Sequence, residues 1–562
     1  MGVRKKKLPI GIENFEKLRS EDFYYIDKTG LIIELLDNWG EVNLFTRPRR
    51  FGKTLNMSML EHFFSLNGDK SIFEGLAISK ETALCEEYMG KYPVIFVSLK
   101  GIDARNYELA FQMAVQIMKR VPLKVQYLLD SDVLTEQDKA EYKRLLDDHM
   151  PVAVFCNSLR VLSELLEKHH GTKVILLIDE YDVPLAKAHA NGYYEQMISL
   201  IRGLLGEALK TNNSLKLAVL TGCLRISKES IFTGLNNLKV LSIADERFDE
   251  YFGFTDKEVR ELLEYYDAVD HYDAVKNWYD GYQFGNAEVY CPWDVLNHCD
   301  RVRSNPEAQP ENYWINTSSN DAVKRFIQES ANAATKKEIE SLVAGEVITK
   351  EIHQELTYPE MYETTDNIWS LLFTTGYLTR RGKPEGRRMK VAIPNLEVRD
   401  IFVTQIMEFF KENVRDDKDT LNCFCKALQN GDAKVVEETF TEYLRRSISI
   451  RDTAVRKDMK ESFYHGVLIG ILGVKTRWGV SSNREMGEGY ADILVEPDSG
   501  DMGIIIEVKY AHNGDLDQAC REALKQIGHS RYEDDLEDDG VEHILKYGIA
   551  CYKKRCKVML AE

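Results

Sequence analysis

The feature that most limits the folds open to this chain is a series of short apolar runs in its first half, separated by segments with a helical pattern. The runs are rich in Val, Ile and Leu, which is typical of strands buried on both faces. Strands that alternate with helices form a parallel sheet covered by helices on both sides. The sequence therefore predicts an α/β fold, with strands at 42–46, 94–99, 174–178, 215–221 and 238–243.

The chain has 562 residues, which is too long for one hydrophobic core. A polar, charged stretch at about 103–170 predicts an all-helical insertion between two strands. After residue 254 the pattern becomes mainly helical and begins with an N-cap at Thr255. Strands return near the end. We expect an N-terminal α/β domain at 1–254, a helical lid and middle region at 255–450, and a smaller α/β domain at 451–562.

Composition restricts the classes of function. The net charge of −18 argues against strong constitutive DNA binding, although a local basic groove remains compatible with it. The ten cysteines lack paired zinc-ligand spacing, so we expect reduced, buried thiols. No apolar run reaches the roughly 18 residues that span a bilayer. The first residues lack the apolar core of a signal peptide, and we expect a cytoplasmic protein without a membrane segment.

Residues 47–54, Arg-Pro-Arg-Arg-Phe-Gly-Lys-Thr, indicate a phosphate-binding loop between a strand and a helix. Backbone N–H groups and the helix dipole favour phosphate at such a helix N-terminus. Lys53 would reach the β- and γ-phosphates, Thr54 would coordinate Mg²⁺, and Gly52 would allow close backbone approach. The loop also places Arg47, Arg49, Arg50 and Phe51 beside the nucleotide. The alternative is a chance Gly-Lys-Thr after a solvated basic turn.

Acidic and polar residues at the ends of two later strands complete this prediction. The run 174–180 is a buried strand that ends in Asp179 and Glu180. Asp179 would hold Mg²⁺, and Glu180 would orient or deprotonate the attacking water. Thr221 ends the next strand and would sense the γ-phosphate. Arg225 follows it and would contact phosphate, or else lie on the surface at a helix start.

The last hundred residues carry a second constellation of charged side chains. A helix contains Glu461, one strand begins near Asp492, and a second strand carries Glu507 and Lys509. Residues two apart on a strand point to the same face, so Glu507 and Lys509 would lie together. The carboxylates would bind Mg²⁺ and Lys509 would orient water, which fits phosphodiester hydrolysis. Gln526, on a following helix, fits an accessory polar position. The alternative is a cross-strand charge pair.

The chain resembles the bacterial and archaeal AAA-ATPase-like proteins with a C-terminal PD-(D/E)XK nuclease-superfamily domain. The resemblance implies a P-loop NTPase sheet with a helical insertion, a helical lid and middle region, and a restriction-endonuclease-like α/β tail. The family pattern itself has Arg at the position of Arg47. The matching pieces span nearly the whole chain and include 8–15, 25–29, 47–54, 177–182, 221–225, 252–255, 278–282, 376–379 and 393–399.

These observations lead to three hypotheses. The first is an ATP-driven or ATP-gated nuclease that uses ATP and Mg²⁺ and acts on nucleic acid of undefined type. The second is a nucleotide-switched regulatory or scaffold protein whose nuclease fold binds without cutting. The third is a nuclease with a purely structural P-loop. Assembly into a homo-oligomer is left open. The aromatic segments 278–282 and 313–316 are interpreted as core anchors rather than base-stacking surfaces.

Overall fold

The computed structural model describes two compact units, Met1–Ser319 with Thr349–Val398 and Asn320–Ile348 with Arg399–Glu562. Each unit is considered by itself below. The described residues are 5–210, 212–224, 232, 236–314, 321–329, 333–416, 418–446, 460–473, 475, 478–486, 489–497, 502–530, 532, 536, 540–541 and 543–561.

The first unit is built on a parallel five-stranded sheet with the order β2-β3-β4-β1-β5. The predicted α/β fold with a parallel sheet is confirmed. The last strand ends before Ser242, two residues earlier than predicted, because the Ser242 N–H donates to the Asp245 carboxylate at 2.7 Å and turns the chain. The strands are β1 (Val42–Thr46), β2 (Val94–Ser98), β3 (Val174–Asp179), β4 (Leu215–Gly222) and β5 (Leu238–Leu241).

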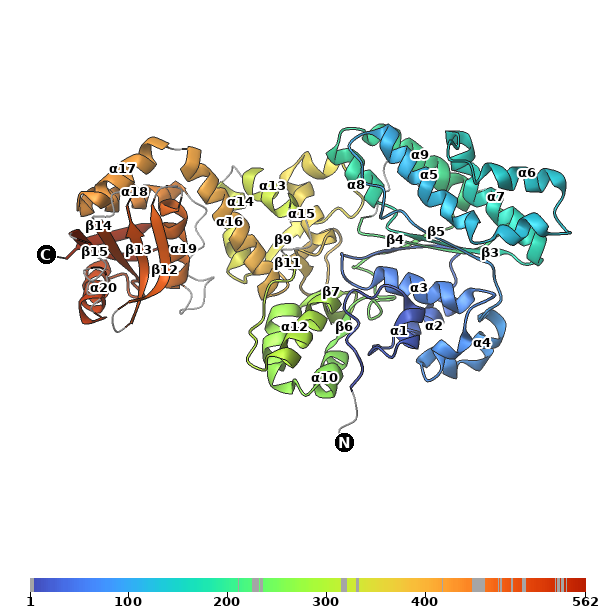
Figure 1. Ribbon diagram of the computed structural model, residues 1–562, viewed down its shortest axis with the longest axis horizontal. Helices are drawn as coiled ribbons and strands as arrows, with labels where there is room; N and C mark the ends of the chain where they lie inside the picture. Colours follow the sequence, from blue (N-terminus) through green and yellow to red (C-terminus); the bar gives the residue numbers. More distant parts are fainter. Residues whose placement is uncertain are drawn as a thin grey trace. The chain divides into compact units, whose positions relative to one another are not determined.

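Helices cover both faces of this sheet (Figure 1). One face carries α1 (Phe15–Ser20), α2 (Gly30–Asp37) and α3 (Lys53–Phe64), with α4 (Thr82–Tyr88) nearby. The other face carries the predicted helical insertion and the helix that follows β3. Its helices are α5 (Tyr107–Leu123), α6 (Glu136–Arg144), α7 (Val152–His170) and α9 (Tyr194–Leu209), and α8 (Val183–Ala190) precedes the last of them.

The remainder of the first unit is mainly helical. The N-cap predicted at Thr255 is present, since its hydroxyl accepts the Glu258 N–H and the Glu258 carboxylate accepts the Thr255 N–H. The helices are α10 (Asp256–Tyr265), α11 (Tyr272–Tyr279), α12 (Pro292–Ser304) and α15 (Thr365–Thr374). Two small sheets accompany them, with β6 (Phe254–Thr255), β7 (Tyr282–Phe284), β8 (Ala287–Tyr290), β9 (Ile348–Glu351), β10 (Thr379–Arg380) and β11 (Arg388–Ala392).

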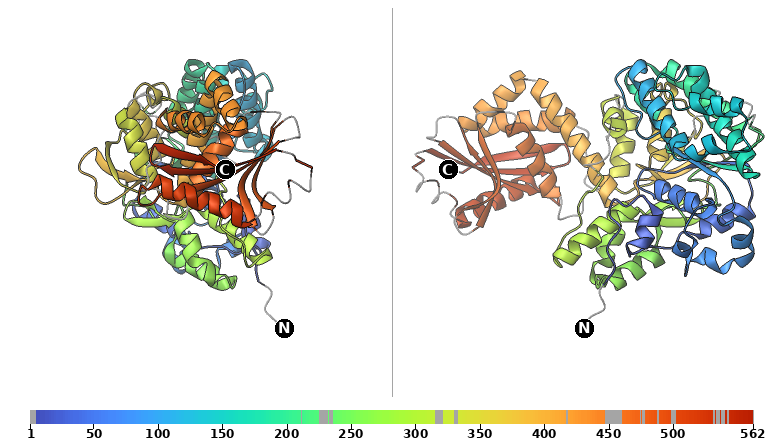
Figure 2. Two further views of the ribbon diagram at one scale, coloured as in Figure 1. Left: turned by 90° about the vertical axis from the view of Figure 1, so that its left-hand side faces the viewer. Right: turned by 45° about the vertical axis from the view of Figure 1, so that its right-hand side comes forward.

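The second unit contains a mixed five-stranded sheet between two layers of helices (Figure 2). Its strands are β12 (Gly479–Met486), β13 (Gly489–Glu496), β14 (Met502–Tyr510), β15 (His543–Tyr552) and β16 (Arg555–Leu560), hydrogen-bonded in sequence order. One sheet face packs on α17 (Lys418–Gln429), α18 (Ala433–Arg446) and α19 (Lys460–Leu472), and the other packs on α20 (Leu516–Ser530). The unit also includes α13 (Asp321–Glu329), α14 (Ala333–Val343) and most of α16 (Leu396–Asp416).

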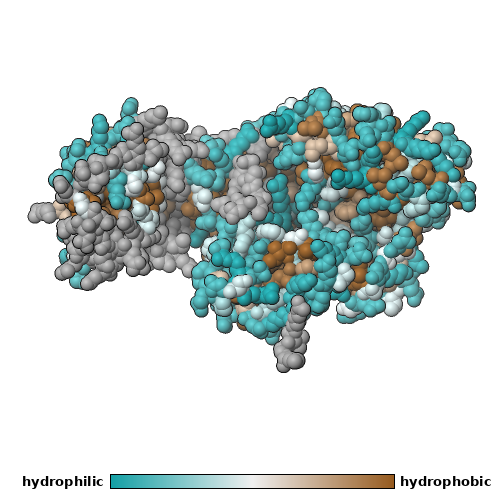
Figure 3. Space-filling model, viewed as in Figure 1, coloured by the Kyte–Doolittle hydropathy of each residue, from teal (hydrophilic) through white to brown (hydrophobic). Residues whose placement is uncertain are grey.

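Hydrophilic residues cover most of the described surface on the face in Figure 3, and hydrophobic residues form small patches. Within the described part of the chain, the structure contains no helix that is both long and apolar enough to cross a membrane.

Candidate functional site

The loop between β1 and α3 wraps around the N-terminus of α3. Gly52 precedes the helix with φ +76°, a left-handed conformation that glycine adopts without strain. Lys53 and Thr54 therefore lie in the first turn of α3. The loop borders a cavity of about 530 Å³, and Arg49, Arg50, Lys53, Thr54 and Glu180 are among its lining residues.

Lys53 is held by groups of its own site. Its side chain is almost fully buried, and Nζ donates to the carbonyls of Arg47 (3.2 Å) and Pro48 (3.0 Å). The Glu180 carboxylate lies 3.5 Å from Nζ. Burial lowers the pKa of Lys53, but the surrounding acidic groups, Cys223 and Glu180 first, outweigh burial and raise that pKa above its ordinary value. Lys53 is therefore a permanently charged donor at the helix N-terminus, with partners that an incoming phosphate could replace.

Asp179 joins the ends of three elements. Its carboxylate accepts the Thr54 hydroxyl at 2.9 Å and the Thr221 hydroxyl at 2.5 Å, and it is fully buried. Burial raises the pKa of Asp179, and the two hydroxyl groups and Lys53 oppose that rise. Thr54 and Asp179 thus present converging hydroxyl and carboxylate oxygens, the donor type that Mg²⁺ prefers. Glu180 follows with φ +53°, and its N–H donates to the Thr221 hydroxyl at 3.4 Å.

The arginines of the loop point in different directions, which the sequence pattern could not show. Arg49 is exposed and lines the cavity, whereas Arg50 extends toward Trp314. Arg47, which was predicted to lie beside the nucleotide, has its side chain in the protein interior. Its guanidinium is fully buried and donates to the backbone carbonyls of residues 46, 241 and 248. The Arg47 side chain satisfies buried carbonyls of the core.

Phe51 and Arg225 are the other two residues of the predicted nucleotide site. Phe51 lies at the cavity wall, but its ring is fully buried against Tyr282 and Phe284. Arg225 lies outside the described residues. The predicted roles of all these loop and strand-end residues remain predictions.

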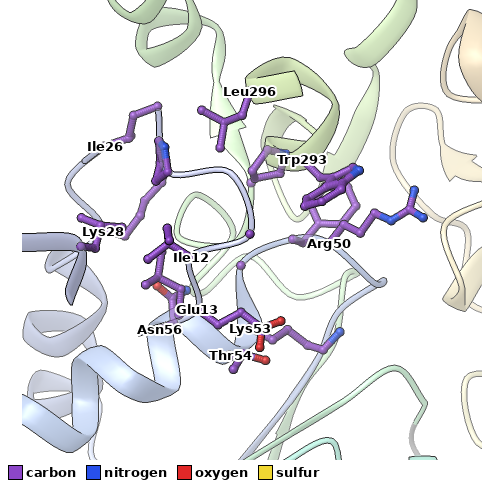
Figure 4. Close-up of a pocket in the computed structure, with 18 of the residues that line it drawn as sticks. Ile12, Glu13, Ile26, Lys28, Arg50, Lys53, Thr54, Asn56, Trp293 and Leu296 are labelled. Atoms are coloured by element: carbon purple, nitrogen blue, oxygen red, sulfur yellow. The ribbon is translucent and has the colours of Figure 1, made fainter. Parts of the chain in front are cut away.

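The cavity extends from the loop into an apolar space that the sequence analysis did not predict (Figure 4). Lys53 and Thr54 lie on one side, and Ile26 and Leu296 lie on the opposite side. The N-terminal segment therefore forms a wall of the site. It is fixed by Lys28, whose Nζ donates to both oxygens of the Glu258 carboxylate at 2.6 and 2.7 Å. The only sequence signal for this wall was the resemblance at 8–15 and 25–29.

Asp182 is a further buried acid that the sequence analysis did not assign. One of its carboxylate oxygens accepts the N–H groups of Cys223 (2.9 Å) and Leu224 (3.0 Å), the two residues directly after β4. Burial and then the Glu180 carboxylate raise the pKa of Asp182 to about 6. Asp182 therefore fixes the chain beyond β4 and adds negative charge near Lys53. Its position three residues after Asp179 was the available signal.

The second unit brings together the charged residues predicted near its C-terminus. Asp492 on β13 and Glu507 on β14 lie on adjacent antiparallel strands. Lys509 Nζ lies 3.1 Å from the Glu507 carboxylate and 3.9 Å from that of Glu461. Asp492 accepts the Val508 N–H at 2.9 Å. Burial and then Asp492 raise the pKa of Glu507 to about 7, while Lys509 opposes the rise.

Two observations bear on whether this cluster fits a metal ion. Glu507 is fully buried, and its Oε2 has no hydrogen-bond partner among the described residues. A buried carboxylate oxygen without a partner is costly and is available to a cation. However, no three His, Cys, Asp or Glu side chains of the described residues form a preformed metal cage. Glu507 therefore offers an unpartnered oxygen to a metal, whereas one oxygen of Asp492 and one of Glu461 each accept a backbone N–H, from Val508 at 2.9 Å and from Tyr510 at 3.2 Å.

His465 and Gln526 lie on helices that pack on opposite faces of the sheet. The ring of His465 lies on α19, and its Nε2 is 2.7 Å from the backbone carbonyl of Asp492, so it supports β13 at the candidate site. Gln526 is half-buried on α20, which packs on the opposite face of the sheet from α19. Its predicted accessory role remains a prediction.

Two segments of the chain match known protein families. Residues 9–232 match the family described as predicted AAA-ATPase, and residues 459–560 match the PD-(D/E)XK nuclease superfamily. An uncharacterized protein in the vnfD 5' region of Azotobacter chroococcum mcd 1 is 27% identical over 409 residues, which are 71% of this chain and 69% of the relative.

Among solved structures, the chain is similar to a signal transduction ATPase with numerous domains that carries a tetratricopeptide repeat sensor, from Pyrococcus horikoshii. The identity is 12% and the TM-score 0.24, with 83% of this chain and 55% of that chain covered. The chain thus spans about half the length of that structure.

Proposed function

We propose that this protein, in which a predicted AAA-ATPase domain is joined to a domain of the PD-(D/E)XK nuclease superfamily, binds and hydrolyses ATP and acts on nucleic acid through its C-terminal domain. The observation that carries the proposal is the convergence of Lys53, Thr54 and Asp179 at the N-terminus of α3, beside a cavity of about 530 Å³. A pocket of this size suits a nucleotide.

The residues of the first site have separable tasks in this proposal. The N–H groups of the loop and Lys53 bind the phosphates, because they supply positive charge at a helix N-terminus. Thr54 and Asp179 would hold Mg²⁺, which would offset charge on the phosphate oxygens. Glu180, whose side chain is 14% exposed, orients or deprotonates water. Thr221 keeps the Asp179 carboxylate in place through its hydroxyl group.

The residues of the second site suit phosphodiester hydrolysis. Asp492 and Glu507 would hold a divalent cation, which would stabilise negative charge on the phosphate. Lys509 orients water and carries a positive charge beside the scissile phosphate. Burial lowers the pKa of Lys509, but Glu507 and Glu461 outweigh burial and raise it, so this lysine stays protonated at neutral pH.

The first experiment tests nucleotide binding. A ligand that binds only the folded state stabilises it, by about 2.7 kcal/mol at a concentration of 100 times Kd. ATP with Mg²⁺ should therefore raise the unfolding temperature of the wild type and not that of Lys53→Ala. Lys257→Ala is the matched control, because that lysine side chain is 85% exposed. An unchanged unfolding temperature of the wild type would refute ATP binding.

The second experiment tests cleavage of plasmid, linear and single-stranded substrates with Mg²⁺ or Mn²⁺, with and without ATP. We expect cleavage by the wild type, loss of cleavage in Glu507→Ala, and loss of the ATP effect in Lys53→Ala. A second candidate function is a nucleotide-switched regulatory protein whose nuclease-like domain binds without cutting. The lack of a preformed three-ligand metal cage among the described residues favours it. Wild-type protein that binds ATP and cuts none of the substrates would support this candidate.

A further inference from the structure

Arg50 links the phosphate-binding loop to residues Tyr313 and Trp314. Its guanidinium donates to the backbone carbonyls of Tyr313 and Trp314, both at 3.3 Å, and lies 5.4 Å from the centre of the Trp314 ring. The backbone of Arg50 has φ +71°, a left-handed conformation that a residue other than glycine keeps only when its surroundings stabilise it. The side chains of Arg50 and Lys53 thus contact different groups.

Glu397 holds the same segment from its other side. One oxygen of its carboxylate accepts the N–H of Tyr313 at 2.6 Å and that of Trp314 at 3.0 Å. The Asn312 side chain donates to the Glu397 backbone carbonyl at 3.2 Å. The peptide bond between Tyr313 and Trp314 therefore has its carbonyl bound by a cation and its N–H bound by the Glu397 carboxyl group. The charge on Arg50 strengthens the hydrogen bond to the Tyr313 carbonyl.

The burial of the Glu397 carboxyl group at this position costs free energy. Glu397 is 0% exposed, and the buried Asp294 carboxyl of α12 lies close to it. Burial and then Asp294 raise the pKa of Glu397 well above its ordinary value. Burial raises the pKa of Asp294 to about 6, and the positive charge of Arg50 opposes that rise. Arg50 is thus electrostatically coupled to a pair of buried acids, and α12 also supplies Trp293 and Leu296 to the cavity wall.

We infer that Glu397 is a positioning residue of the nucleotide site, which fixes Arg50 through the Tyr313–Trp314 peptide. This inference rests on the proposed nucleotide binding. It also has a consequence for regulation. Glu397 lies in the first turn of α16, and that helix continues from Val398 in the first unit to Arg399 in the second. A nucleotide phosphate that pairs with Arg50 at the cavity wall would weaken the carbonyl side of this link, which is anchored in the first turn of α16.

The first test needs no nucleotide. Hydrogen–deuterium exchange of the full-length protein is measured in the peptide that contains residues 312–314, for the wild type, Arg50→Ala and Glu408→Ala. Glu408 is an exposed glutamate on the same helix and serves as the control. Loss of the two Arg50 hydrogen bonds should speed exchange of the Tyr313 and Trp314 amides about tenfold. Glu408→Ala should leave exchange unchanged. Unchanged exchange in Arg50→Ala would overturn the link.

The second test separates positioning from a structural role. Affinity for a non-hydrolysable ATP analogue is measured for Glu397→Ala and Glu397→Gln, in the wild-type and Arg50→Ala backgrounds. We expect Glu397→Ala to weaken binding about tenfold in the wild-type background and to have no further effect without Arg50. Glu397→Gln keeps an acceptor oxygen and should recover part of the loss. An equal loss in both backgrounds would mean a structural role and overturn the inference. Wild-type protein that binds no analogue would refute the proposed function itself, whatever the exchange result.

Discussion

Replacement of Glu507 by Gln should stabilise the metal-free C-terminal unit at high pH and leave its stability at low pH nearly unchanged. Glu507 is fully buried on β14, and burial, followed by the neighbouring Asp492, raises its pKa from 4.5 to about 7. A carboxyl group with a raised pKa in the folded state binds its proton more tightly folded than unfolded. The wild type therefore loses stability as the pH rises from about 4.5 to about 7, and the loss stays constant at higher pH.

The size of the effect follows from the two pKa values. One pKa unit corresponds to 1.36 kcal/mol, so the rise of Glu507 from 4.5 to about 7 sets an upper limit of about 3 kcal/mol. Coupling to Asp492 spreads this cost over two carboxyl groups, and we expect about 1–3 kcal/mol at pH 8. Gln keeps the shape of the side chain and cannot ionise, so the variant should not show this loss.

The assay is urea unfolding with excess EDTA at pH 5 and pH 8, detected by pulse proteolysis and mass spectrometry of peptides from residues 489–561. Glu522→Gln is the matched control, because Glu522 is exposed on α20 and should not change the pH dependence. Parallel stability curves for the wild type and Glu507→Gln across this pH range would show that Glu507 ionises as freely as an exposed carboxyl. The reasoning that assigns it to a buried cation site would then be wrong.

Three further predictions concern the first unit. Asp182→Ala should lower the free energy of unfolding by about 1–3 kcal/mol, because two backbone N–H groups after β4 lose their buried acceptor. Urea unfolding measures this loss, and we expect a smaller loss in Asp182→Asn. Glu258→Ala should cost about 3 kcal/mol, because the buried Lys28 charge loses its ion-pair partner and keeps a hydrogen bond to the Glu250 carbonyl. The double replacement Lys28→Met with Glu258→Leu should recover part of this loss, since a leucine side chain at position 258 cannot accept the Thr255 N–H at the start of α10. Glu180→Gln should tighten ATP binding several-fold, because a negative charge 3.5 Å from Lys53 is removed. It should also slow hydrolysis, because Gln cannot deprotonate water. Weaker binding in calorimetry would contradict this prediction.

The sheet of the first unit could be predicted because its strands are apolar on both faces, a pattern that few other structures produce. The strand order could not, because it depends on which strands pair and not on their composition. The placement of Asp179 and Thr221 followed from a simple rule, since parallel strands bring their carboxyl ends to one edge of the sheet. The hydrogen bonds from Thr54 and Thr221 to Asp179 are the observed result.

The sequence gives less information about the direction of long side chains. Arg47, Arg49 and Arg50 are equivalent in a motif, yet Arg47 is buried among carbonyls, whereas Arg49 and Arg50 line the cavity and Arg50 also reaches Trp314. Backbone conformation decides between them, and φ +71° at Arg50 is not encoded by any local pattern. Contacts distant in sequence, such as that between Trp314 and Glu397, were invisible for the same reason.

The two candidate sites share one physical design, although their folds are unrelated. In each, a lysine is held beside carboxylates in a buried place, Lys53 with Glu180 and Lys509 with Glu507. Burial of such groups costs more than a mutual ion pair returns, unless further partners complete the site. The unpartnered Oε2 of Glu507 is a group for which no such partner is present among the described residues. A cation with its phosphate would supply that partner, because the cation would contact the carboxylate and the phosphate would contact the lysine. We therefore expect ligand binding to raise the stability of each site.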